Sequence, residues 1–188
     1  SLAGGESHDE VFTMTVTDDQ GATASQDVTV TVTGTNDAPV LTASQGASAF
    51  TEDAGAITVN PTVTVTDADS ADFDTGTLTV TITTGGTSDD RLIIENIGTS
   101  AGQISVSGST VSYEGNPIGT FTGGTGTTDL VVTLNADADD VAAQALMRAI
   151  QYDNVSDTPS TAARAVDMTL TDGDGGSAVA STSVSVAA

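Results

Sequence analysis

Residues 77–84 read TLTVTITT, a strict alternation of branched apolar residues with threonine that decides the fold class. Successive side chains of a β-strand point to opposite faces, so Leu78, Val80 and Ile82 share one face and the threonines share the other. Clusters of Gly, Asp and Asn separate such runs. The same two-residue period recurs at residues 28–33, 62–66, 130–134 and 183–186. Many short strands of this kind predict an all-β fold, an antiparallel β-sandwich.

One segment, from about residue 138 to residue 150, has a helical period instead. Its apolar residues recur at spacings of three and four, and they are Ala142, Ala145, Leu146, Ala149 and Ile150. Several aspartates precede this stripe, where carboxylates interact favourably with the helix dipole. We expect one short crossover helix between two strands. Covering an open end of the sandwich core is its expected use, with a binding role as the alternative.

The charge balance argues against several classes of function. The 188 residues include three Arg and no Lys against 21 Asp and five Glu, which gives a net charge of −23. Such a charge repels nucleic-acid phosphates and anionic lipid surfaces, so we expect no nucleic-acid partner. No apolar run approaches the roughly 18 residues of a membrane span, so we expect no membrane insertion. With no Cys and one His, the chain has few groups for nucleophilic catalysis, and we do not expect an enzyme.

The acidic residues are mostly aspartates, which points to a divalent cation. Asp is short and favours turns, and Ca²⁺ takes six to eight oxygen ligands from loops rich in such residues. A large net charge also pushes a compact state apart unless salt or bound cations offset it. The composition therefore predicts Ca²⁺ as the cofactor. Adaptation to a salty medium is the alternative explanation of the same composition.

An internal repeat predicts how the chain is organised. Residues 14–24 read MTVTDDQGATA, and residues 168–178, which lie 154 positions later, read MTLTDGDGGSA. Each copy predicts a strand, an Asp/Gly turn and a second strand. We expect residues 1–34 to be the closing hairpin of a preceding repeat in a longer tandem array, residues 35–40 to be a linker, and residues 41–188 to be a complete repeat. The alternative is that the hairpin adds to the sheet of one larger domain.

Several motifs resemble those of known repeat families. Residues 2–40 resemble the end of a VCBS repeat, through LAGGE at 2–6, FTMTVTD at 12–18 and TVTGTNDAPV at 31–40. The NDAP linker is also similar to the Ca²⁺-binding linker of cadherins. The remainder resembles the cadherin-like and immunoglobulin-like repeats of giant bacterial RTX-type adhesins. The motifs that carry this second resemblance are TVTDADS at 64–70, DFDTGTLTV at 72–80, ALMRAIQYDNVSD at 145–157 and TDGDGG at 171–176.

The resemblance also implies where metal ligands lie. An immunoglobulin-like strand order brings the loop after Thr66, the turn after Thr171 and the linker to one end of the sandwich, where Glu6 of the preceding unit faces them. Carboxylates held together repel one another, and Ca²⁺ converts that repulsion into attraction and stiffens the joint. The candidate metal ligands are Asp67, Asp69, Asp37, Asn36, Glu6, Asp172, Asp174, Asp72 and Asp74.

Four of these candidates have an alternative role. A solvated hairpin tip explains Asp172 and Asp174 equally well. A turn before Gly76 is the alternative role of Asp72 and Asp74. These four residues therefore stay open between metal binding and turn formation.

One position departs from the cadherin pattern. Gly4 stands where cadherins usually have an acid two residues before the Glu of their strand-linking motif, which corresponds to Glu6 here. We therefore expect this joint to hold fewer ions than a cadherin joint. Glu52 and Asp53 follow the first strand of the complete repeat, so we expect them at the opposite end of the sandwich.

Two functions follow from the resemblance and the composition. The first is a non-enzymatic, Ca²⁺-stabilised repeat of a bacterial surface adhesin, secreted by a type I route and acting as a rigid extender in cell adhesion and biofilm formation. Its partners are neighbouring repeats, with self-association and cell-surface polysaccharide as further candidates. The second is a Ca²⁺-dependent carbohydrate-binding module of an adhesin or of a polysaccharide-degrading enzyme. The chain has no Trp and only two Tyr, so it offers few aromatic platforms for sugars.

Overall fold

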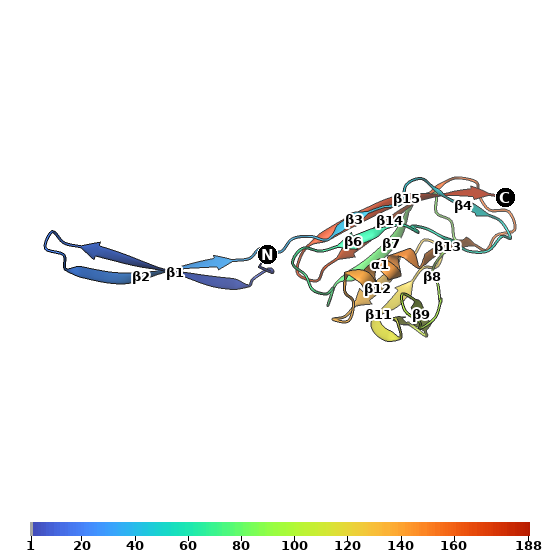
Figure 1. Cartoon of the computed structure of the whole chain (residues 1–188). Coiled ribbons are helices and arrows are strands. Elements are labelled where there is room, and N and C mark those ends of the chain that lie inside the picture. Colours follow the sequence, from blue (N-terminus) through green and yellow to red (C-terminus); the bar gives the residue numbers. More distant parts are fainter. Residues whose placement is uncertain (1) are drawn as a thin grey trace.

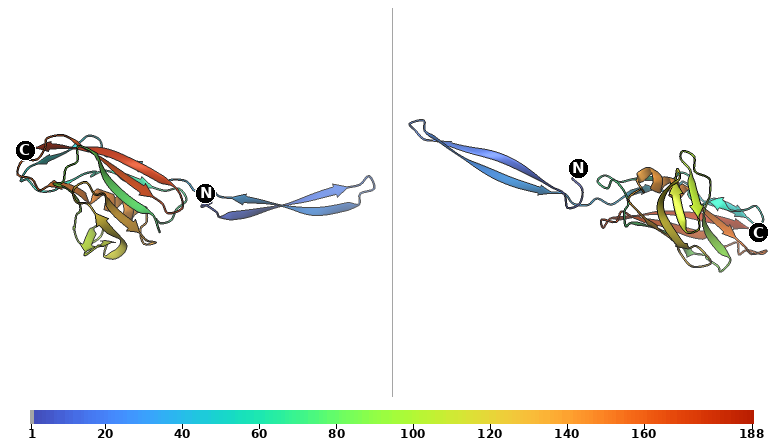
Figure 2. Two further views of the ribbon diagram at one scale, coloured as in Figure 1. Left: turned by 180° about the vertical axis from the view of Figure 1, so that it is seen from behind. Right: turned by 90° about the horizontal axis from the view of Figure 1, so that it is seen from below.

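The computed structural model describes residues 2–188 and has two parts, a long β-hairpin and a β-sandwich with one helix (Figure 1). The hairpin consists of β1 (Ser7–Thr17) and β2 (Thr23–Thr33), paired in unbroken antiparallel register. It forms a two-stranded sheet of its own and extends away from the sandwich, with its base beside it (Figure 2). The hairpin therefore does not add a strand to the sheets of the sandwich.

An eight-stranded sheet forms the larger layer of the sandwich. Its neighbouring strands pair antiparallel, as predicted, except at one edge, where β15 and β4 pair parallel. In sheet order the strands are β4 (Ser48–Thr51), β15 (Ser177–Ala187), β14 (Arg164–Thr171), β7 (Thr77–Thr84), β12 (Leu130–Leu134), β11 (Asn116–Gly123), β10 (Thr110–Tyr113) and β9 (Ile104–Ser107).

Two small sheets complete the sandwich. One has the order β5 (Ile57–Thr58), β13 (Ile150–Asn154) and β8 (Asp90–Ile94), and the other pairs β3 (Val40–Thr42) with β6 (Thr64–Thr66). Their apolar side chains and those of the large sheet belong to one core, because Val80, Met168, Leu92, Tyr152 and Val65 are all buried in it. The predicted all-β sandwich is confirmed. The linker is one residue shorter than expected, since Val40 already lies in β3.

The helix α1 (Asp140–Arg148) connects β12 to β13 as predicted. It is shorter than the predicted range of 138–150 because Asp139 is extended and caps the first turn, accepting a hydrogen bond from the backbone N of Ala142. Ile150 already belongs to β13. The helix lies against β6, where Gln144 Oε1 accepts a hydrogen bond from Val65 N. No helix among residues 2–188 has the length and apolar character needed to cross a membrane.

A buried ion pair lies in the core beneath the large sheet. The side chains of Arg164 and Asp90 are fully buried, with Arg164 Nη2 3.1 Å from Asp90 Oδ1. Tyr152 Oη and Asn154 Nδ2 donate to the same carboxylate. Burial raises the pKa of Asp90, but these donors and the backbone N of Thr87 outweigh it and hold that pKa below its usual value. Asp90 is therefore ionised in the folded protein.

Candidate site at the joint between hairpin and sandwich

The linker between the two parts is tied to the sandwich by two of the predicted residues. Asn36 Nδ2 donates a hydrogen bond of 2.8 Å to Asp172 Oδ2. The backbone N of Asp37 lies 3.2 Å from both carboxylate oxygens of Asp69. The structure therefore brings the linker, the β6–β7 loop and the β14–β15 turn together, as the sequence predicted.

Asp172 holds the turn between β14 and β15 as well as the linker. Its Oδ1 accepts hydrogen bonds from the backbone N atoms of Asp174, Gly175 and Gly176, and its Oδ2 accepts from Asn36. Burial raises its pKa, yet these donors outweigh that effect and lower the pKa overall. Asp172 is thus an ionised, fully hydrogen-bonded turn residue, and its turn-forming role is met without a metal.

Two glycines allow the close approach at this joint. A Cβ on Gly176 would lie 2.1 Å from Asp172 Oδ2 and 2.7 Å from the Cα of Ala38. A Cβ on Gly4 would lie 2.9 Å from the Cβ of Asn36. A side chain at position 4 would therefore force Asn36 or the surrounding backbone to shift.

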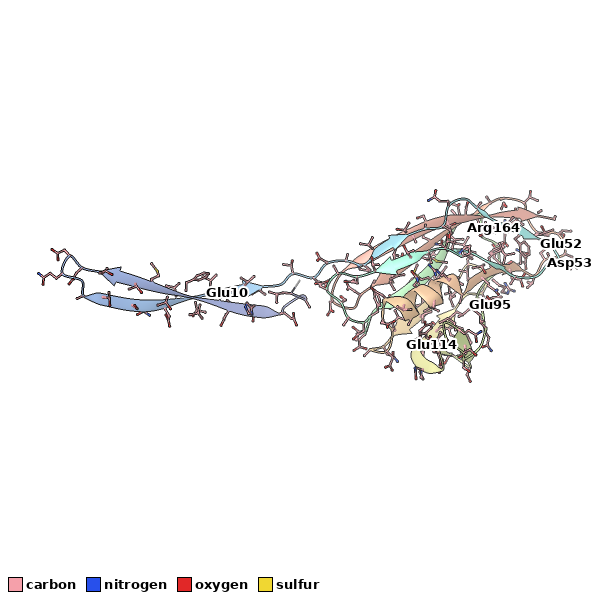
Figure 3. All side chains as sticks on the ribbon, in the orientation of Figure 1. Glu10, Glu52, Asp53, Glu95, Glu114 and Arg164 are labelled. Atoms are coloured by element: carbon pink, nitrogen blue, oxygen red, sulfur yellow. The ribbon has the colours of Figure 1, made fainter. Side chains whose placement is uncertain are left out.

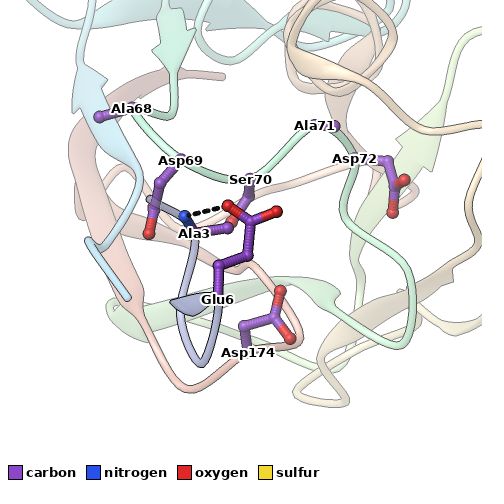
Figure 4. A pocket seen from close by; sticks show the side chains of 8 residues that line it. All are labelled: Ala3, Glu6, Ala68, Asp69, Ser70, Ala71, Asp72 and Asp174. Atoms are coloured by element: carbon purple, nitrogen blue, oxygen red, sulfur yellow. Dashed lines mark hydrogen bonds between the residues drawn. The ribbon is translucent and has the colours of Figure 1, made fainter. Parts of the chain in front are cut away.

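Four predicted acids line an open hollow of about 510 Å³ at the joint (Figure 4). Glu6 comes from the base of the hairpin, Asp69 and Asp72 come from the β6–β7 loop, and Asp174 comes from the β14–β15 turn. Alanines and Ser70 complete the lining, which contains no basic residue. Glu6 Oε2 accepts a hydrogen bond of 3.1 Å from the backbone N of Ala3. The hollow is thus a strongly anionic pocket formed by both parts of the chain.

Asp67 lies next to this hollow and contacts the helix. Its Oδ1 accepts hydrogen bonds from the backbone N atoms of Asp69 and Ser70, and its own backbone N donates to Asp140 Oδ2. Three oxygens in this group are buried without a hydrogen-bond partner, namely Asp67 Oδ2, Ser70 Oγ and Asp140 Oδ1. Buried polar atoms normally have a partner, so these three are available to a ligand.

The pKa of Asp140 reflects this arrangement. Burial raises it, the hydrogen bond from Asp67 N lowers it, and the negative charges of Asp67 and Asp139 raise it further, so that the net direction is upward. In the sequence, Asp140 is only one of the several aspartates at the start of the predicted helix. The pairing with Asp67 depends on the packing of α1 against β6, and no local sequence pattern specifies that packing.

Asp74 has a smaller part in the joint than its neighbours. Its backbone N donates to Asp72 Oδ1 in the turn that leads into β7. Its backbone O lies so close to Gly173 that a Cβ there would be 2.0 Å away. Asp74 thus supports the predicted turn, while Asp72 serves both the turn and the hollow.

The nine predicted residues therefore gather at one end of the sandwich without forming one compact cluster. Among residues 2–188, no three or more His, Cys, Asp or Glu side chains are already disposed to hold a single metal ion. Glu52 and Asp53 lie at the other end of the sandwich, as expected (Figure 3). No protein-family model matches this chain, and no curated protein matches it significantly.

Proposed function

We propose that this protein is a non-enzymatic, Ca²⁺-stabilised repeat module of a secreted bacterial surface adhesin. It acts as a rigid extender in cell adhesion and biofilm formation, with neighbouring repeats as its partners. The adhesin assignment is supported by the resemblance of the sequence motifs. The calcium assignment is supported by one observation above all, the three buried oxygens without partners beside the acidic hollow.

The chemistry of the donors suits Ca²⁺. Calcium takes carboxylate, hydroxyl and carbonyl oxygens from flexible loops, and the joint offers carboxylates and a serine hydroxyl without a competing cation. Asp67 and Asp140 would hold one ion with Ser70, and Glu6, Asp69, Asp72 and Asp174 would hold another in the hollow. A bound cation would also remove the repulsion that raises the pKa of Asp140.

An ion in the hollow would make the joint stiffer because its ligands come from both parts. Glu6 belongs to the base of the hairpin, whereas Asp69 and Asp174 belong to loops of the sandwich. Bridging these groups would add ionic links to the hydrogen bonds that Asn36 and Asp37 already make. The chain is elongated, with the hairpin at one end and the C-terminus at the other, which suits an extender (Figure 1).

Calcium titration with calorimetry tests the proposal. At a hundredfold excess over its Kd, Ca²⁺ should stabilise the fold by about 2.7 kcal/mol, and Tm should rise by roughly 5–10 °C. Extracellular calcium modules bind with a Kd of about 10⁻⁴ to 10⁻³ M, so a hundredfold excess corresponds to about 10 to 100 mM Ca²⁺. Mg²⁺ at equal ionic strength is the control for screening. Equal effects of the two ions, or none, would remove calcium from the proposal.

Paired variants locate the effect. Asp67→Asn with Asp69→Asn should abolish most of the calcium-dependent rise in Tm. Glu52→Gln with Asp53→Asn removes the same charge from the opposite end of the sandwich and should leave the rise intact. If both pairs reduce the rise equally, calcium acts through general charge screening and not at the joint.

The acidic hollow is open, which favours a competing proposal, a Ca²⁺-dependent carbohydrate-binding module. A Ca²⁺ ion held there could keep coordination positions for the hydroxyls of a sugar, as in a carbohydrate-binding module. A glycan array with and without Ca²⁺ tests it, using Asp69→Asn and Asp174→Asn as controls that remove lining carboxylates. Binding that needs both calcium and these carboxylates would favour the sugar module over a purely structural joint.

A further inference from the structure

The β1–β2 hairpin exposes an apolar face, whereas the equivalent face of the β14–β15 hairpin is buried. On one face of β1–β2 the side chains of Phe12, Met14, Val16, Val28, Val30 and Val32 are between 39% and 71% exposed. The opposite face is mainly polar and is held by hydrogen bonds such as Thr13 Oγ1 to Asp27 Oδ1. An isolated two-stranded hairpin is marginally stable in water, and a contiguous exposed apolar face marks an interaction surface.

The sandwich contains the same hairpin in its covered state. The cross-strand pairs of β14–β15 run from Arg164 opposite Val184 to Thr171 opposite Ser177, and subtracting 154 from each number gives the pairs of β1–β2 without a shift. Val166, Met168, Leu170, Val184 and Val186 occupy the positions of Phe12, Met14, Val16, Val30 and Val32, and all five are buried. The two hairpins are therefore structural equivalents in opposite environments.

The covered hairpin also shows which strands its edges take. The edge of β14 that faces away from β15 pairs antiparallel with β7, placing Met168 opposite Val80 and Leu170 opposite Leu78. The edge of β15 that faces away from β14 pairs parallel with β4. By equivalence, β1 offers its edge to an antiparallel strand along Met14 and Val16, and β2 offers its edge to a parallel strand along Val30 and Val32.

One pair of equivalent positions carries charges of opposite sign, and this pair specifies the partner. Glu10 stands in β1 where Arg164 stands in β14, and in the sandwich the equivalent side chain faces the buried carboxylate of Asp90. A second copy of residues 40–163 placed on β1–β2 would bring Asp90 against Glu10. Two carboxylates forced together out of water repel strongly, so strand exchange with a second copy is disfavoured.

We infer that β1–β2 closes a different β-sandwich body, one that carries a cationic side chain opposite Glu10 in the place of Asp90. Within residues 40–188, the β-sandwich body that covers the β14–β15 hairpin comes directly before it in the chain. Its last strand, β13, ends at Asn154, and β14 begins at Arg164. By the same order, the occupant is a body of the same polypeptide that lies on the N-terminal side of the hairpin. This inference concerns the hairpin alone and does not depend on calcium at the joint.

Grafted chains test the inference. Residues 35–154 are joined ahead of residue 1 of the full chain, which keeps the 154-residue spacing, and four versions are made: unchanged, with Asp90→Arg in the graft, with Glu10→Arg, and with both. Hydrogen exchange of the amides in residues 7–33 is followed by mass spectrometry in EDTA. The ungrafted chain gives the exchange rate of the uncovered hairpin.

The two versions with opposite charges, Asp90→Arg alone and Glu10→Arg alone, should slow exchange in the hairpin about 100-fold relative to the ungrafted chain. The unchanged and double versions, which oppose like charges, should give at least about tenfold less protection. The same protection in all four versions would overturn the charge-paired partner, and no protection in any would overturn docking of such a body. Sedimentation of the ungrafted chain is the further control, since a dimer with a protected hairpin would show that a second copy covers the face.

Discussion

The β1–β2 and β14–β15 hairpins have the same pattern and the same register but opposite surroundings. Met14 in β1 is 61% exposed, whereas its equivalent Met168 in β14 is fully buried between β15 and β7. An alternating sequence therefore fixes which side chains share a face, but it does not fix whether that face is buried. Burial depends on the strands that lie alongside, and only β14–β15 has them within residues 2–188.

The largest expected difference between the hairpins concerns the charged residue at their equivalent positions. Arg164→Met leaves Asp90 buried without its cation and should destabilise the sandwich by about 3–5 kcal/mol, the usual cost of breaking a buried ion pair. Glu10→Met changes a side chain on the exposed hairpin and should change stability by less than about 0.5 kcal/mol. Urea unfolding measured by circular dichroism checks both variants. Similar effects of the two substitutions would contradict the assignment of opposite environments.

Acid unfolding sharpens the comparison at the two turns. Asp18 and Asp172 are equivalent and each accepts backbone hydrogen bonds in its turn, but only Asp172 is also bound by Asn36. The lowered pKa of Asp172, like that of Asp90, gives stability that is present above the unfolded pKa of about 3.9 and is lost as the pH falls through the folded pKa. Stability should fall by about 1.4 kcal/mol per pH unit for each extra proton that the unfolded chain binds.

Asp172→Asn should make this acid dependence shallower, and Asp18→Asn should leave the unfolding of the sandwich unchanged. Urea midpoints measured at intervals from pH 7 to pH 3 give the slopes. A parent slope that does not steepen below about pH 4, or equal slopes for the two variants, would contradict the role of Asp172 at the joint.

A substitution of Asp140 should have a smaller effect on stability, with opposite signs in the absence and presence of Ca²⁺. Its pKa is raised by burial and by the charge of Asp67, so its ionised form opposes folding at neutral pH when no metal is bound. Asp140→Asn should therefore raise stability in EDTA by on the order of 1 kcal/mol, the energy of two like charges about 4 Å apart in water. In saturating Ca²⁺ the same variant should be less stable than the parent.

Calorimetry in EDTA and in saturating Ca²⁺ measures the expected gain and the expected loss of stability. The control is Asp137→Asn, which removes a nearby charge that is exposed and does not contact Asp67. A loss of stability for Asp140→Asn in EDTA would show that Asp140 is structural and not a site of stored repulsion.

The strands could be predicted because they follow from a local pattern, the alternation around Leu78 and Leu130. The gathering of the DAD and DGDG turns at one end was predicted from the immunoglobulin-like strand order that the resemblance implies. The predicted helix is confirmed, and it begins later than residue 138 because Asp139 is extended and acts as the cap, a choice that the apolar stripe does not encode.

The pairings that join distant segments could not be predicted. Asp140 meets Asp67 only because α1 packs against β6, and Arg164 meets Asp90 only because β14 and β8 lie in facing layers. Each contact spans more than 70 positions, so nothing in the local sequence distinguishes its residues from solvated charges. Such long-range contacts depend on the complete fold.

The proposed stiffening of the joint by calcium is best tested by measuring the distance between the hairpin and the sandwich. Since the chain has no cysteine, Asp19→Cys at the hairpin tip and Asp157→Cys on the sandwich provide two spin-label sites for pulsed electron paramagnetic resonance. The distance distribution should be broad in EDTA and narrow to a single peak in saturating Ca²⁺. A distribution of the same width in both buffers would contradict the claim.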